Sequence, residues 1–78
     1  MPWSTAFDDP VRVSNKRTLL TLQEAADYIM QLPADAQHEV HWQTAIETLI
    51  NAAEAGGGWV MFARIAMLRA LNAAHRRR

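Results

Sequence analysis

Two histidines near the start of an expected helix are the first candidates for metal binding in this 78-residue chain. His38 and His41 lie three positions apart, with Glu39 between them. The zinc-protease pattern H-E-x-x-H places its histidines four apart and needs a third ligand elsewhere. The remaining histidine, His75, precedes three arginines, whose charge opposes a bound cation. We therefore expect no metal site and no cofactor.

A run of three glycines, Gly56-Gly57-Gly58, precedes another expected helix. Free backbone N–H groups at the start of a helix bind phosphate, so this run is a candidate anion site. The phosphate-loop pattern G-x-x-x-x-G-K-[ST] is missing, and a helix instead of a strand leads into the glycines. We interpret the run as the end of one helix followed by a flexible connector.

The remaining candidates for catalysis are two serines and a pair of acids. Ser4 and Ser14 lie outside any G-x-S-x-G context, which is the setting of a nucleophilic serine. Asp8 and Asp9 adjoin Pro10, where a turn or the entry to a strand explains them without catalysis. The sequence therefore predicts that the protein is not an enzyme.

The elements that would position these residues begin with a β-hairpin. Residues 11–14 alternate apolar and polar side chains, and residues 17–20 are rich enough in β-forming residues to return as a second strand. Asn15-Lys16 is predicted to form the turn between them. An isolated hairpin is marginally stable in water, so we expect it to pack on helices.

Three helices are predicted after the hairpin. Thr21-Leu22-Gln23-Glu24 has the form of a capping box, and the first helix ends at Pro33. After a connector over 33–38, the second helix extends from about Glu39 to Gly56, and the third from about Trp59 to about His75. The fold class is thus α+β, in the order ββααα. We expect a flexible arm over 1–6, a single domain over 7–75 and a basic tail over 76–78. The predicted core comprises Val11, Val13, Leu20, Leu22, Ala26, Ile29, Trp42, Ala45, Ile46, Leu49, Ala63, Ala66, Met67, Ala70 and Leu71.

The third helix is apolar on two sides. At 100° per residue its main apolar face comprises Trp59, Val60, Ala63, Ala66, Met67, Ala70, Leu71 and Ala74. A second, narrower stripe of Met61, Ile65 and Leu68 lies among the polar residues, flanked by Arg64 and Arg69. The rest of the chain offers no obvious cover for this stripe. We therefore predict an interaction surface comprising these five residues, used in a homodimer or with an unidentified protein partner.

The formal net charge of zero hides an asymmetry. All eight acids lie in residues 1–54 beside three bases, whereas residues 55–78 contain five arginines and no acid. An alternative function is therefore a nucleic-acid-binding accessory protein that uses the arginines of the last helix and tail. The sequence pI of 6.8 makes nucleic-acid binding the less favoured reading. Arginines interrupt the last apolar segment, so no membrane span is expected. Because the N-terminus lacks a basic region followed by an apolar run, we expect a cytoplasmic protein.

Five motifs, taken in order, resemble a known family. They are Phe7–Val13 (FDDPVRV), Leu22–Ala26 (LQEAA), Leu32-Pro33, Trp42 with Ala45, and Ala63–Met67 (ARIAM). Together they resemble the family of small bacterial proteins designated domain of unknown function 982, over residues 7–74. The chain departs from that family at Gln31, where a tryptophan is usual, and at Met67, where an aromatic residue is usual. The resemblance implies a compact hairpin-plus-helices domain and no established activity. The leading hypothesis is thus a non-enzymatic interaction or regulatory module that self-associates through its last helix.

Overall fold

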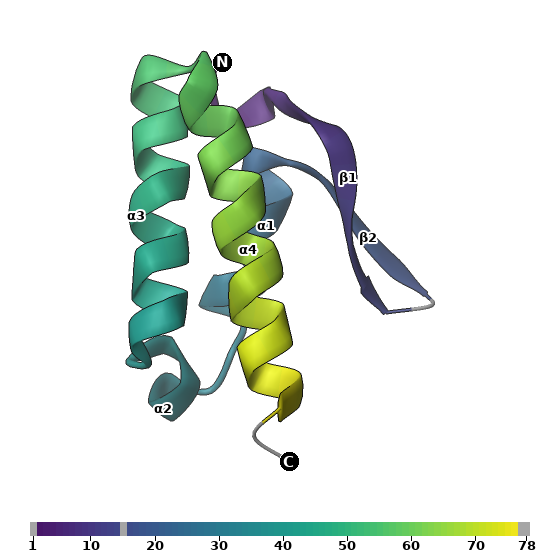
Figure 1. Ribbon diagram of the computed structural model, residues 1–78, viewed down its shortest axis with the longest axis vertical. Helices are drawn as coiled ribbons and strands as arrows, with labels where there is room; N and C mark the ends of the chain where they lie inside the picture. The colour runs from purple at the N-terminus through teal and green to yellow at the C-terminus, as the bar shows by residue number, and fades with distance from the viewer. Residues whose placement is uncertain (1, 15, 77–78) are drawn as a thin grey trace.

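The computed structural model describes residues 2–14 and 16–76, and it confirms the predicted α+β fold with a hairpin followed by helices. Figure 1 shows α3 and α4 side by side, with α1 behind them and the hairpin along the other side of α4. The elements in chain order are η1 (Pro2–Ser4), β1 (Ala6–Ser14), β2 (Arg17–Thr21), α1 (Leu22–Met30), α2 (Ala34–Gln37), α3 (Val40–Ala55) and α4 (Gly58–Arg76).

The hairpin is longer and less regular than predicted. Strand β1 begins at Ala6 instead of Val11 and includes Pro10, and its antiparallel pairing with β2 shifts register twice, between Ala6 and Val11 and again before Ser14. Val11 pairs with Leu19, and both side chains are buried. The prediction that Leu20 belongs to the core is wrong. Leu20 is about half exposed, because neighbouring strand residues face opposite sides and Leu19 faces the core. Asn15 of the predicted turn lies outside the described residues.

The start of α1 follows the predicted cap with one change. The Thr21 hydroxyl accepts a hydrogen bond from the Glu24 N–H at 3.2 Å, as a capping residue should. The Glu24 carboxylate accepts from the N–H of Leu20 at 2.8 Å, one residue before the cap, and so ties the helix to β2. The predicted connector over 33–38 contains a short additional helix, α2. The Gln37 side chain closes this segment by donating to the Leu32 carbonyl at 2.7 Å.

The two long helices are joined by a tight glycine turn. Gly56 and Gly57 have φ angles of 66° and 56°, a left-handed conformation that side-chain-bearing residues rarely adopt. The Gly56 N–H donates to the Ala52 carbonyl at 2.8 Å and closes α3 where the sequence predicts its end. The glycines therefore reverse the chain, and Gly58 begins α4.

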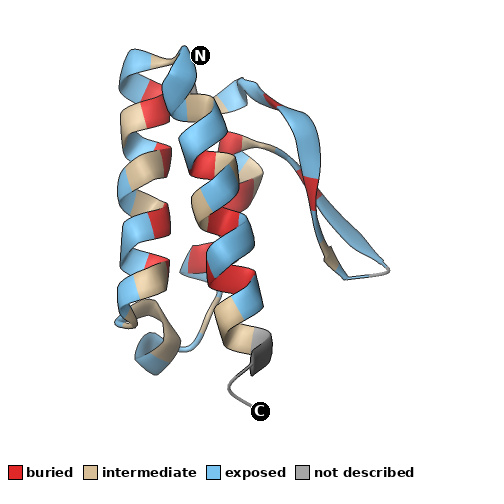
Figure 2. Ribbon diagram, viewed as in Figure 1, coloured by how far each residue is buried: buried red, intermediate tan, exposed pale blue. Residues whose placement is uncertain are grey.

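The core lies where α1, α3, α4 and the hairpin meet, and the buried faces of the helices turn toward it (Figure 2). Of the predicted core, Val13, Ile46 and Ala66 are half-buried against it, and Phe7 is a buried member that the prediction omitted. The other predicted core residues, apart from Leu20, are buried: Val11, Leu22, Ala26, Ile29, Trp42, Ala45, Leu49, Ala63, Met67, Ala70 and Leu71.

The N-terminal segment differs from the flexible arm expected over 1–6. Pro2–Ser4 form a single 3-10 turn against α1 and α3, and the half-buried Trp3 packs on the core. The N–H of Leu22 donates to the Thr5 carbonyl at 3.0 Å. A large aromatic side chain is costly to leave in water, and this cost explains why the segment folds back. At the other end, Arg77 and Arg78 of the predicted tail lie outside the described residues.

Candidate interaction surface

The predicted stripe on α4 lies at the surface. Met61 is 58% exposed, Ile65 36% and Leu68 37%. Figure 2 shows exposed residues of α4 alternating with half-buried and buried ones along the helix. The hairpin covers the stripe only in part: Met61 and Ile65 line a hollow together with Asp8 and Asp9 of β1. We use the name outer face of α4 for the surface formed by Met61, Ile65 and Leu68 together with Trp59, Phe62 and Arg69.

Two aromatic residues enlarge the apolar part of this surface. Phe62 is 56% exposed, and Trp59 is exposed as well, with their ring centroids 5.8 Å apart in an edge-on arrangement. The prediction that Trp59 belongs to the main buried face is wrong, because Trp59 lines the open groove between α3 and α4. Phe62 belongs to neither predicted face. Its spacing of three residues from both Trp59 and Ile65 is the signal that places it beside them on the helix surface.

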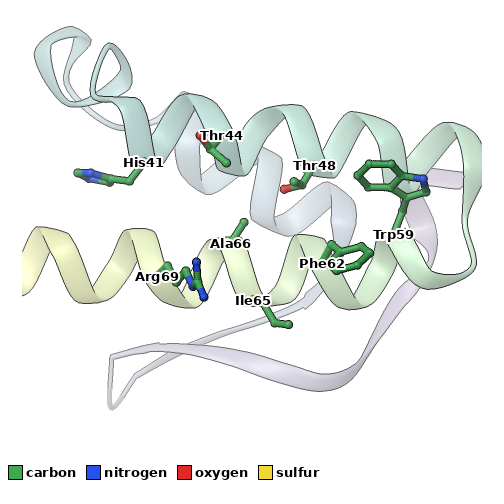
Figure 3. A pocket seen from close by; sticks show the side chains of 8 residues that line it. All are labelled: His41, Thr44, Thr48, Trp59, Phe62, Ile65, Ala66 and Arg69. Carbon is green, nitrogen blue, oxygen red and sulfur yellow. The ribbon is translucent and has the colours of Figure 1, made fainter.

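A groove separates α3 from α4 on the face of the helix pair that lies opposite α1 (Figure 3), and we call this face the open face. The groove has a volume of about 670 Å³. Trp59 and Phe62 lie toward one end of it, and His41 and Arg69 lie at the other. The lining residues are His41, Thr44, Thr48, Trp59, Phe62, Ile65, Ala66 and Arg69. The groove thus combines large side chains from α4 with short hydroxyl side chains from α3.

The two arginines of the predicted surface have separate surroundings. Arg64 is half-buried beside β1, where its Nε donates to the Asp9 carbonyl at 3.0 Å and its Nη2 lies 3.8 Å from the Asp9 carboxylate. Arg69 lines the groove on the other side of the helix. It makes no hydrogen bond or ion pair within the described part of the chain. Arg64 therefore holds the hairpin against α4, and Arg69 is available to a partner.

The separation of these arginines also bears on nucleic-acid binding. Phosphate binding draws on several cationic side chains that face one way. Arg64 is already engaged by β1, and Arg69 points to a different side of α4. The geometry of the described arginines therefore gives the nucleic-acid alternative no specific support.

The two helices that border the groove differ in charge. Helix α4 contains arginines and no acidic residue, whereas α3 contains Glu47 and Glu54 and no lysine or arginine. Both glutamates are exposed, and neither has an ion pair in the described residues. Glu39, the residue just before α3, already has a partner, because its carboxylate lies 3.0 Å from His41 Nε2. The charged side chains of α4 are thus cationic, and the acids of the helix pair are on α3.

The described residues contain no cluster of three His, Cys, Asp or Glu side chains that could hold a metal ion. Over residues 2–14 and 16–76, no helix has both the length and the apolar character needed to cross a bilayer. What the described surface offers is an apolar face with one unpaired cation, an arrangement suited to docking against another protein.

Searches with protein-family models, among curated proteins and among solved structures find no match to this chain.

Proposed function

We propose that this protein is a non-enzymatic interaction module whose working surface is the outer face of α4. The observation that carries the proposal is the exposure of Met61 and Phe62, each more than half exposed, beside Ile65 and Leu68. Large apolar side chains scattered singly over a surface need no explanation, but a contiguous group of them marks a binding face.

The composition of this face supports a protein partner. Aromatic residues, methionine and arginine are enriched in protein interfaces, and the outer face of α4 contains all three kinds. The groove is broad and open, whereas sites for small molecules enclose most of the ligand surface. The leading form of the proposal is self-association. We further propose a cytoplasmic location and membership of the family that the motifs resemble.

The proposal is tested by capturing partners from native lysate with the tagged wild-type protein and two variants. Met61→Glu places a charge at the most exposed apolar residue of the outer face. Met30→Glu makes the same substitution at an exposed methionine at the end of α1, away from α4, and serves as the matched control. We expect Met61→Glu to lose a captured protein that the wild type and Met30→Glu retain.

Circular dichroism must first show equal helix content in the three proteins, which is expected because both methionines are exposed. Identical captured proteins in all three samples would contradict the proposal.

A further inference from the structure

Arg69, the unpaired cation of α4, lines the groove, and the helix across that groove, α3, carries the exposed acids Glu47 and Glu54. We infer that the occupant of the open face is a second copy of the chain, docked so that α4 of each copy lies against α3 of the other. The inference rests on the proposed interaction function and specifies its partner. The resulting assembly is a four-helix bundle built from two α3–α4 pairs.

Charge favours this pairing over one in which the two α4 helices meet. In an α4-to-α4 contact every charged side chain would be a cation, because α4 has no acidic residue. In an α4-to-α3 contact Arg69 would meet the helix that bears Glu47 and Glu54. Opposite charges across an interface set its register and exclude like-charged arrangements, so the α3 partner is the consistent one.

Side-chain size favours the same pairing. Helix α4 presents Trp59, Phe62 and Ile65 on the open face, whereas α3 presents Thr44 and Thr48. Large side chains packed against short ones let two helices approach closely, because the knobs of one fill the spaces of the other. Two α4 helices would instead place bulky side chains against each other along their whole contact.

The groove also fixes which residues would meet. Across the groove from Arg69 lies the turn of α3 that begins at Thr44 (Figure 3). A two-fold axis parallel to the helices keeps every residue at its own level. It therefore brings Arg69 to the same turn of the other copy, which also carries the partner's Glu47. The symmetry makes this contact twice in each dimer.

The dimensions of the open face bear on the area that such a contact would bury. The 16 residues of α3 span about 24 Å, and two adjacent helices are about 20 Å wide. A standard interface removes about 800 Å² from each partner, roughly 15% of the 5266 Å² that the chain exposes.

The test is a charge exchange between two single variants, Arg69→Glu and Glu47→Arg, measured by analytical ultracentrifugation. Each variant alone places like charges together at both contacts of its homodimer. We expect the dissociation constant of each to rise about tenfold or more. An equimolar mixture restores an opposite-charge pair at both contacts, so the mixed dimer is expected to bind within about threefold of the wild type.

Three results would overturn the inference: a wild-type protein that stays monomeric at about 200 µM, single variants that dimerise like the wild type, or a mixture as weak as its components. If the wild type is monomeric yet Met61→Glu still loses a captured partner, the proposed function stands and only the second-copy inference fails. Because both positions are exposed, each variant is expected to fold, which circular dichroism checks.

Cysteine cross-linking gives a second measurement that does not depend on charge. The chain has no cysteine, so single introduced thiols report unambiguously. Oxidising Arg69→Cys mixed with Glu47→Cys is expected to give a linked heterodimer, whereas Arg69→Cys mixed with Gln23→Cys on α1 is not. Preferred linking of Arg69→Cys to itself would indicate an α4-to-α4 contact and would overturn the inference.

Discussion

Two methionines on α4 allow its orientation to be tested with a single kind of substitution. Met67 is fully buried, whereas Met61 is 58% exposed. Both lie inside the helix, so the difference in helix propensity between methionine and alanine is the same in Met67→Ala and Met61→Ala. The difference between the two variants therefore measures which side of α4 faces the core.

The magnitude for Met67→Ala follows from the atoms that leave the core. Loss of Cγ, Sδ and Cε at about 0.8 kcal/mol per CH₂-sized group gives about 2.4 kcal/mol. A residual cavity of about 60 Å³ adds about 1.5 kcal/mol if the neighbours do not collapse into it. We expect a loss of about 2–4 kcal/mol, against a total stability of about 4–12 kcal/mol for 78 residues. Met61→Ala should change stability by less than about 0.5 kcal/mol.

The assay is thermal unfolding followed by far-ultraviolet circular dichroism. For a domain of this size the loss at Met67 corresponds to a decrease in Tm of about 10–25 °C, whereas Met61→Ala should remain within about 3 °C of the wild type. The measurement belongs at a protein concentration where the wild type sediments as a monomer, so that association does not contribute. A Met61→Ala protein destabilised as much as Met67→Ala would show that α4 is rotated, and the argument for an exposed apolar face would fail.

Three further predictions concern the cap, the glycine turn and the hairpin contact. Thr21→Ala removes the side-chain acceptor at the start of α1 and should cost about 1 kcal/mol, seen as a Tm about 5 °C lower. Gly57→Ala forces a side chain into a left-handed conformation and should lower the denaturation midpoint in urea. Gly58 lies in the first turn of α4 with open space around it, so Gly58→Ala should leave the midpoint unchanged or raise it. Asp9→Asn should lower the free energy of unfolding by less than about 0.5 kcal/mol, because the shorter contact of Arg64 is to the Asp9 backbone carbonyl. Arg64→Ala removes both contacts and should lower it more. Equal midpoints in urea for these two variants would contradict this order.

Periodicity was sufficient to place the helices and most of their buried faces. The 100° spacing separates Met67 from Met61 correctly, because α4 is long and its core face is wide. It could not choose between Leu19 and Leu20, since two adjacent apolar residues in a strand fit either orientation. The pairing of Leu19 with Val11 decides the matter, and that register depends on the turn and on the irregularities of β1.

Parts of the surface depend on contacts that no local pattern contains. Arg64 bonds to a carbonyl 55 residues earlier in the chain, so its role in holding the hairpin becomes visible only in the folded arrangement. Trp59 is predicted to be buried from its angular position, yet the open groove between α3 and α4 leaves it exposed. Trp3 becomes ordered because α1 and α3 supply a place for it, which the composition of the first six residues does not reveal.

The irregularity of β1 has a consequence for how copies of this chain can meet. A two-stranded sheet leaves strand edges unpaired, and unpaired edges are templates for open-ended polymerisation. Here Pro10 removes one amide donor from β1, the Asp9 carbonyl is already occupied by a guanidinium, and the register breaks twice within nine residues. Such an edge offers no regular ladder for an incoming strand. Uncontrolled fibril growth through the β1 edge is thereby disfavoured.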